Sequence, residues 1–430
     1  MSVGTLHANI VLDDPSRIHC GNRDPVLGHI SIRYSPGRGN ASAELFGPLK
    51  VFVTLHGRAK TKIWKSNGQS TSIYRGRAPL FFHQVLVYDD SFRAQPRDTA
   101  IFPFNLFFPE VADAIVQDEF SQDLRFICHR NQPLPASFQN SYHGFAHRYE
   151  AFVEYRVGVD VVMPQLQVEV NKPTEYLEPV VHYEGPRASQ PANSRPYDWR
   201  GLVSVTNELL LPEEDRPSGF RQKTKALFGA GNFPTYAFDW LCLAPKDLYL
   251  GQPACFEVRI KPREKECTAT LIPEVRLKFF HVTITAHTQV RADRTIFSSP
   301  ESEGNYAVFE MMGAIDTREP FSKANENTKI VNTKALGSGS IGTFSSSFAT
   351  YNISQTYTVQ ITFGFEVTGK VKNIDKEYVV IVHPPLEIAP PPAAATAGPS
   401  SQPLNTENKA SDLPPYEPSP AYEETSTGNK

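Results

Sequence analysis

The chain has 430 residues, which is enough for two domains of ordinary size or for one large domain with a tail. Its hydrophobic fraction of 40% and its charged fraction of 21% are those of a protein that buries a substantial core. The formal net charge of −3 lacks the basic excess that is typical of nucleic-acid-binding domains, so we expect no nucleic-acid partner.

The five cysteines are scattered and include no C-x-x-C pair, so the sequence predicts neither a zinc site nor a disulfide framework. The first residues lack the basic start and the apolar run of a secretory signal. No stretch approaches the roughly 20 apolar residues that cross a bilayer. Together these features predict a cytoplasmic protein with reduced thiols and with neither a metal nor a cofactor.

Strand patterns dominate the chain. Runs rich in β-branched and aromatic residues, several of them alternating apolar with polar side chains, predict strands at 52–56, 81–88, 151–159, 254–260, 280–285, 356–361 and 378–382. Turn-forming residues stand at 35–37 and 66–68. A helical pattern is confined to one short candidate at 109–116. Many short strands separated by Gly and Pro favour β-sandwiches.

Composition predicts four segments: a sandwich domain at 1–165, a polar, proline-bearing inter-domain segment at 166–220, a second sandwich domain at 221–388, and a Pro-rich tail at 389–430. The tail holds few large apolar residues, so burial cannot offset its chain entropy and we expect it to be disordered. The predicted fold class is therefore all-β, with two tandem antiparallel β-sandwich domains and a disordered C-terminal tail.

Several short stretches of the two predicted domains also have a geometric interpretation of their own. Gly57 at a strand end tolerates a bulge or a sharp bend. Pro103 and Pro135 suit edge strands or the first residues of strands. These are scaffold positions, and we expect none of them to be catalytic.

In type and order, these stretches resemble the arrestin family, specifically the fungal α-arrestin-like trafficking adaptors. The resemblance is carried in the first half by residues 34–37, 55–61, 102–106, 134–138 and 153–157, and in the second half by residues 272–275, the strand up to 290–291, and 350–354 running on to 369–370. It implies an arrestin-like fold for both domains and a non-catalytic adaptor role.

The tail contains a four-residue motif that fits the Leu/Pro-Pro-x-Tyr form read by WW domains, made of Leu413, Pro414, Pro415 and Tyr416. Consecutive prolines favour polyproline II, so little chain entropy remains to be lost on binding, and the tyrosine fills a neighbouring pocket. Pro420 and Tyr422 form a second, auxiliary contact of the same kind, which adds avidity if the partner has several WW domains. The alternative is a chance match, because Pro-rich composition already favours such tetrapeptides.

The resemblance implies a function for this motif. Adaptors of this family recruit WW-domain HECT-type ubiquitin ligases to plasma-membrane transporters or receptors, whose cytosolic segments they bind, and the cargo is then ubiquitinated and endocytosed. The implied location is the cytoplasm, peripherally at the plasma membrane and endosomes. The alternative is an arrestin-like or retromer-like scaffold that binds membrane cargo without recruiting a ligase. An enzyme is not expected, since neither G-x-S-x-G nor H-E-x-x-H occurs.

A basic stretch without acidic residues runs from His56 to Tyr88, with cations at Arg58, Lys60, Lys62, Lys65, Arg75 and Arg77. On a strand, Lys60 and Lys62 point to one face, where such a cluster attracts anionic lipid headgroups at about 1 kcal/mol per residue. The alternative is an ordinary solvated face or a lysine-protected edge strand.

Two further patterns are interpreted as structural. Residues 337–342 match G-x-G-x-x-G, but poor helix formers follow them, so we predict a loop between strands. Residues 352–354 have the form of a glycosylation sequon and are predicted to be a loop or strand segment.

Overall fold

The computed structural model describes residues 4–37, 44–66, 68–113, 123–127, 129, 131–144, 147–164, 168–188, 191–216, 233–293, 300–312, 319–321, 327–336 and 344–387. These residues lie in one compact unit, Met1–Glu387. Their regular structure is almost entirely β, with the short 3₁₀ helices η1 (Glu208–Leu210), η2 (Glu213–Asp215) and η4 (Glu264–Glu266). Among them, no helix has the length and apolar character needed to span a membrane.

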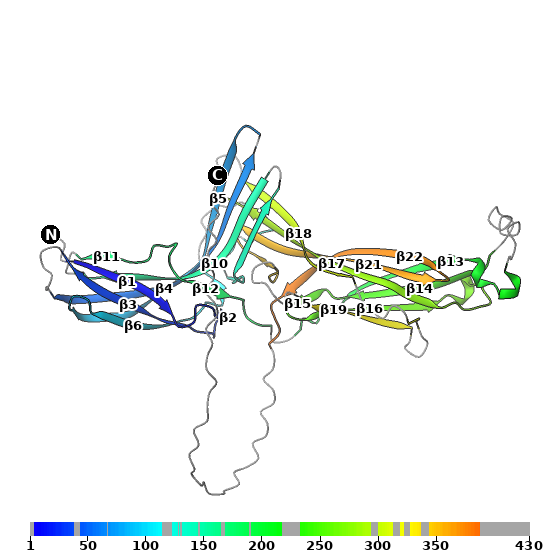
Figure 1. Ribbon diagram of the computed structural model, residues 1–430, viewed down its shortest axis with the longest axis horizontal. Coiled ribbons are helices and arrows are strands. Elements are labelled where there is room, and N and C mark those ends of the chain that lie inside the picture. Colours follow the sequence, from blue (N-terminus) through cyan, green and yellow to red (C-terminus); the bar gives the residue numbers. More distant parts are fainter. Residues whose placement is uncertain are drawn as a thin grey trace, which may run out of the picture. The chain divides into compact units, whose positions relative to one another are not determined.

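The first sandwich pairs a smaller sheet with a larger one (Figure 1). The smaller sheet has the order β11 (Glu169–Asn171), β1 (Gly4–Leu12), β3 (Val26–Pro36), β6 (Thr99–Leu106). The larger sheet has the order β2 (Ile18–His19), β12 (Val180–Tyr183), β10 (His147–Val162), β4 (Leu45–Ser66), β5 (Thr71–Ala94), and β9 (Phe138–His143) also pairs with β10. A short pair, β7 (Val111–Ala112) and β8 (Gln132–Pro133), completes this half. Leu6 and Ile30 of the smaller sheet share one core with Val53 and Tyr155 of the larger sheet.

The second sandwich repeats this plan. One sheet has the order β13 (Tyr197–Thr206), β14 (Thr235–Ala244), β16 (Pro253–Pro262), β19 (Thr328–Ala335). The other has the order β15 (Asp247–Tyr249), β22 (Lys370–His383), β21 (Ile353–Val367), β17 (Val275–Arg291), β18 (Glu301–Met312), and β20 (Phe348–Ala349) also pairs with β21. Phe238 and Phe256 pack in one core with Phe280 and Phe363.

Alternation along the strands explains why these residues form sheets with one buried face. In β21, Tyr357, Val359, Ile361 and Phe363 are fully buried, and polar residues stand between them. Each large apolar side chain buried in this way stabilises the fold by about 1.5–3 kcal/mol. The period of two therefore determines which face of the strand enters the core.

The structure confirms the predicted fold class, because the described residues form two β-sandwiches in tandem. Every strand predicted in the sequence lies within β4, β5, β10, β16, β17, β21 or β22. The sheets are not purely antiparallel, however: β1–β11, β2–β12 and β15–β22 are parallel pairs. These pairs join strands from distant parts of the chain, which no local pattern indicates.

Some local expectations need correction. The helix expected at 109–116 is wrong where the structure describes it, because Val111–Ala112 pairs with Gln132–Pro133 as a strand. The register between β4 and β5 shifts at Gly57/Arg58, as expected for a bulge, but Gly57 does not end its strand, which continues to Ser66. Pro103 lies in β6, an edge strand of the smaller sheet.

The segment 166–220, expected to connect the domains, contains three strands. β11 belongs to the smaller sheet of the first sandwich and β12 to its larger sheet, and β13 is the first strand of the second sandwich. Its proline and charge content suggested a linker, but pairing with neighbouring strands decides strand formation in such sequences. Residues 389–430 lie outside the described part of the chain.

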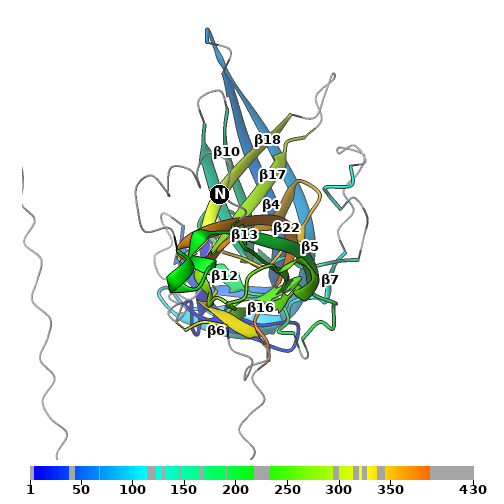
Figure 2. The same cartoon turned by 90° about the vertical axis from the view of Figure 1, so that its right-hand side faces the viewer.

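The long hairpin of β4 and β5 extends beyond the core of the first sandwich (Figure 1). Gly68, with φ of 85°, lies in the turn that joins the two strands, a conformation that glycine adopts readily. The distal part of this hairpin lies beside β10, β17 and β18 in Figure 2. β9, which pairs with β10, also contacts the second sandwich. Its Asn140 donates hydrogen bonds to Thr288 (2.8 Å) and Tyr306 (2.9 Å) of that sandwich.

Candidate functional site: a charged band on the β4–β5 hairpin

Charged side chains line one face of β4, β5 and β10 in the first sandwich. This charged band comprises Arg58, Lys60 and Lys62 of β4, Arg75 and Arg77 of β5, and Glu150, Glu154 and Arg156 of β10. As predicted, Lys60 and Lys62 point away from the buried Thr61 between them. Lys60 stands directly opposite Arg77, and Lys62 opposite Arg75. Like charges in register repel each other, so this face needs counter-ions.

β10 supplies the central counter-ion. Glu154 stands opposite Arg58 in the register and accepts hydrogen bonds from Arg58 Nε (2.7 Å) and Arg156 Nη2 (3.1 Å), while Lys60 Nζ lies 2.6 Å from its Oε1. Burial opposes ionisation of this carboxyl, but the hydrogen bonds from Lys60 and Arg58 outweigh it and lower the pKa of Glu154 to about 2. Glu154 is therefore ionised at neutral pH and holds three cations together.

Arg58 is not available to a lipid surface, contrary to the sequence-based expectation. Its side chain is only 6% exposed, because it lies against Glu154 of β10 and Glu175, with which it forms ion pairs. Burial lowers the pKa of Arg58, and the contact with Glu154 opposes that effect. Its Nη2 is buried without a hydrogen-bond partner among the described residues.

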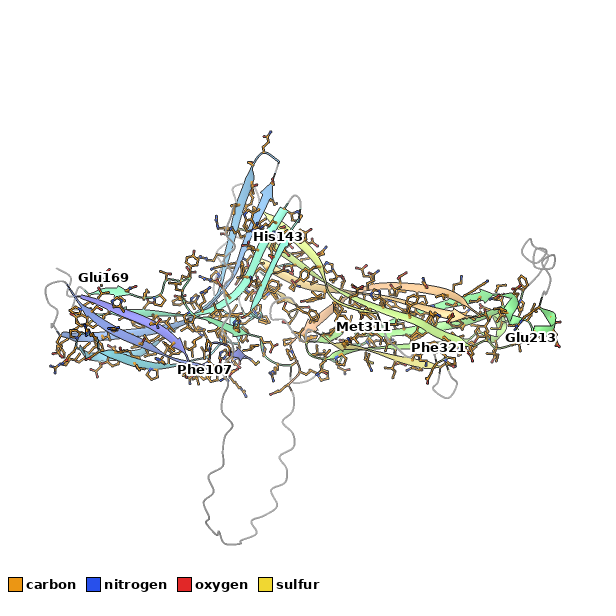
Figure 3. All side chains as sticks on the ribbon, viewed as in Figure 1. Phe107, His143, Glu169, Glu213, Met311 and Phe321 are labelled. Carbon is orange, nitrogen blue, oxygen red and sulfur yellow. The ribbon has the colours of Figure 1, made fainter. Side chains whose placement is uncertain are left out.

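A segment that we call the strap, residues 172–179, lies over this face. It runs from β11, where Glu169 is labelled in Figure 3, to β12. Glu175 forms an ion pair with Arg58 and lies 3.6 Å from Arg77 Nη2. Glu178 lies 3.0 Å from His56 Nε2, and its carbonyl accepts a 2.7 Å hydrogen bond from Arg156.

β10 leaves space for the strap and forms a backbone hydrogen bond with it. A Cβ atom at Gly158 of β10 would lie 2.8 Å from Glu178 Oε1, so the absence of a side chain there lets Glu178 lie flat on the strand. The backbone N–H of Val157 donates to Pro179 O (3.1 Å). The middle of the strap faces outward: Tyr176 is 74% and Leu177 is 75% exposed.

The distal part of the band is more open. Lys62 Nζ lies 4.3 Å from the centre of the Trp64 ring, and Arg148 stacks on the same ring at 4.1 Å. Lys65 and Arg75 are exposed. Lipid contact by Lys62, Lys65, Arg75 and Arg77 remains a prediction.

The opposite side of the same hairpin is fixed to the second sandwich. Thr61 donates to the carbonyl of the buried Arg291 (2.7 Å). The fully buried Asn352 donates from its amide to Ala59 O (3.2 Å). Arg77 N donates to Asp293 Oδ1 (3.3 Å). The hairpin thus presents charge on one face and holds the second sandwich with the other.

Other predicted positions have these outcomes. The motif residues Leu413 to Tyr416, the auxiliary residues Pro420 and Tyr422, and the glycine-rich stretch 337–342 all lie outside the described residues. The sequon-like stretch 352–354 begins at a buried asparagine and continues into β21, as predicted for a strand segment. Among described residues, Cys20, Cys242, Cys255 and Cys267 are free thiols, and no group of three or more His, Cys, Asp or Glu side chains could hold a metal.

The site residues predicted from the sequence did not include those of β10 or of the strap. Glu150, Glu154 and Arg156 are spaced two or four apart around the predicted strand 151–159, so their shared face was open to prediction. Their position beside the basic stretch was not, because it depends on the pairing of β10 with β4. The strap carries no strand or motif signal that points to the hairpin.

The chain is similar to squid arrestin, with a TM-score of 0.31 and 9% sequence identity, over 89% of this chain and 100% of that chain. No protein-family model matches the sequence, and no curated protein matches it.

Proposed function

We propose that this chain is a non-catalytic adaptor that brings a WW-domain HECT-type ubiquitin ligase to plasma-membrane transporters or receptors. The two sandwiches bind a cytosolic segment of the cargo, and the tail binds the ligase. The cargo is then ubiquitinated and endocytosed. The adaptor acts in the cytoplasm, peripherally at the plasma membrane and endosomes.

The observation that carries the proposal is the position of the motif at Leu413–Pro414–Pro415–Tyr416. It follows Glu387, where the compact unit ends, in a segment with few large apolar residues. A WW domain needs an extended proline segment followed by a tyrosine, and a Pro-rich segment of this composition offers both.

The sandwiches support the cargo-binding half of the proposal. Their described strands form a scaffold, and the charged band on it is a surface for ionic recognition of a cytosolic segment. Arg75 of the band and Lys65 near the end of β4 are exposed cations suited to the anionic leaflet beside such cargo.

The test is a titration of purified WW domains from a HECT-type ligase with a peptide covering residues 405–430. We expect a micromolar Kd, about −8 kcal/mol at 1 μM, which is usual for a short peptide ligand. The Tyr416→Ala peptide is expected to bind at least about tenfold more weakly, which is about 1.4 kcal/mol. Equal binding by both peptides, or none by either, refutes ligase recruitment and favours a scaffold without a ligase.

A further inference from the structure

The strap supplies counter-ions that the sheet beneath it lacks. At this end of the charged band the permanent cations are Arg58, Lys60, Arg77 and Arg156, and Glu154 is the carboxylate that the sheet itself provides among them. The strap adds Glu175 and Glu178. With the strap in place, four cations face three carboxylates; without it, they face one. Lifting the strap therefore changes a nearly neutral surface into one with three positive charges in excess.

The cations beneath the strap form a surface that can bind anions. Arg58, 5% exposed, keeps its buried Nη2 without a hydrogen-bond partner, so a guanidinium donor is still available there. A buried donor of this kind gains energy when an acceptor reaches it. The glycine at 158 leaves room for a carboxylate on the surface of β10.

The contacts of the strap are those of a bound peptide. Arg156 Nη1 donates to the backbone carbonyls of Tyr176 (3.4 Å) and Glu178 (2.7 Å). The two carboxylates of the strap are bound by side chains of the sheet: Glu175 pairs with Arg58, and Glu178 with His56. Beyond one turn in which Thr174 O accepts from Leu177 N and Glu178 N, the hydrogen bonds of the strap go mainly to the sheet. Its outward residues Tyr176 and Leu177 bury little surface that would hold it in place.

We propose that the strap is an internal ligand of the charged band, and that an acidic peptide segment of a partner protein, with two carboxylates three residues apart on one turn, replaces it. The spacing is that of Glu175 and Glu178. The site is closed in the free protein and opens when the partner's carboxylates take over the contacts with Arg58 and His56. This inference rests on the proposed adaptor function for the identity of the partner, a cytosolic cargo segment, and goes beyond it in naming the surface and its cover.

A peptide with the sequence of residues 171–180 tests the idea, because it carries both carboxylates in the strap's own context. Its affinity is measured by fluorescence anisotropy for the full-length chain and for the Glu175→Gln/Glu178→Gln double variant. The double variant is expected to bind at least about tenfold more tightly, because a site that is open only in a small fraction of molecules loses apparent affinity by that fraction. Gly158→Ala, added to the double variant, is expected to weaken peptide binding, since its Cβ takes the space in which the peptide's second carboxylate would lie.

Controls separate this site from general electrostatic attraction. Glu213→Gln/Glu214→Gln removes the same charge from exposed positions in the second sandwich and is expected to leave peptide affinity unchanged. The same peptide with both glutamates replaced by glutamine is expected to lose binding to the opened variant. Arg77, which is 56% exposed, can be changed to Gln in the opened variant without disturbing a core, and that change is expected to weaken binding at least about threefold.

Equal affinity for the wild-type chain and the opened double variant overturns the proposal, and so does the absence of binding to either of them. Binding that survives replacement of the peptide's glutamates also overturns it, because the carboxylates would then not be what is recognised. Titration of the same preparations with a WW domain reports on the tail alone, so failure of the strap inference and failure of the proposed function are distinguished.

Discussion

Replacing Glu154 with Gln tests how the charged band contributes to stability. Glu154 is 17% exposed and is the carboxylate shared by Arg58, Lys60 and Arg156. Its pKa is lowered from 4.5 to about 2, a difference worth about 3 kcal/mol between its charged and neutral forms. The substitution leaves the buried Arg58 short of a charged partner, which is the costly way to break a buried ion pair. We therefore expect the free energy of unfolding at pH 7 to fall by about 3 kcal/mol.

The pH dependence of this effect has a definite sign. The pKa of Glu154 is lower in the folded chain than in the unfolded chain, so the stabilisation is fully present above about pH 4.5. It is lost as the pH falls from about 4.5 to about 2, where the carboxyl takes up its proton in the folded state. The gap in stability between the wild-type chain and E154Q is therefore expected to narrow over that window.

The assay is urea denaturation at pH 7 and at pH 3, followed by tryptophan fluorescence and analysed with the slope held common. Glu150→Gln is the matched control, because Glu150 lies on the same face of β10 but pairs with the half-exposed Arg148. We expect that control to cost less than about 1 kcal/mol. If E154Q and E150Q differ by less than about 0.5 kcal/mol at pH 7, the reasoning about the band is refuted.

Three further predictions concern the rest of the fold. Asn352→Ala removes a buried amide that donates to Ala59 O, and is expected to lower the free energy of unfolding by about 1–3 kcal/mol in the same urea assay; an unchanged value would mean that this bond does not hold the sandwiches together. Gly201→Ala places a Cβ 2.6 Å from a buried indole ring and is expected to cost about 1–3 kcal/mol, with a shift in tryptophan emission. Alkylation at pH 8, followed by mass spectrometry, is expected to modify the exposed Cys255 well before Cys242, because burial raises the pKa of Cys242 to about 12 and the thiolate is the reactive form; equal rates would contradict the burial of Cys242.

Local periodicity was enough to predict parts of seven strands and the shared direction of Lys60 and Lys62. Lys60 and Lys62 alternate with Thr61, and the alternation survives in the folded hairpin because one face of β4 is buried along this stretch. It did not reveal that Arg58, on the same face as Lys60 and Lys62, is covered by its ion pairs with Glu154 and Glu175. These two partners come from β10 and from the strap, so the sequence of β4 alone does not reveal the burial.

The remainder of the site depends on contacts between distant residues. Glu154 reaches Arg58 from 96 residues away, and Asn352 reaches Ala59 from 293 residues away. Sequence patterns report on neighbours along the chain, whereas these contacts follow from strand order and from how the sandwiches meet. The strap was hidden for the same reason, since Glu175 and Glu178 acquire a role only through the sheet beneath them.

The central claim, that the tail recruits a ligase, is tested most directly by binding of the full-length chain to a full-length WW-domain HECT-type ligase. Tyr416→Ala is compared with Tyr422→Ala, which changes the same residue type in the auxiliary position. We predict that Tyr416→Ala weakens the complex at least about tenfold and that Tyr422→Ala has an effect of about threefold or less. Retention of wild-type affinity by the Tyr416→Ala chain would contradict the claim.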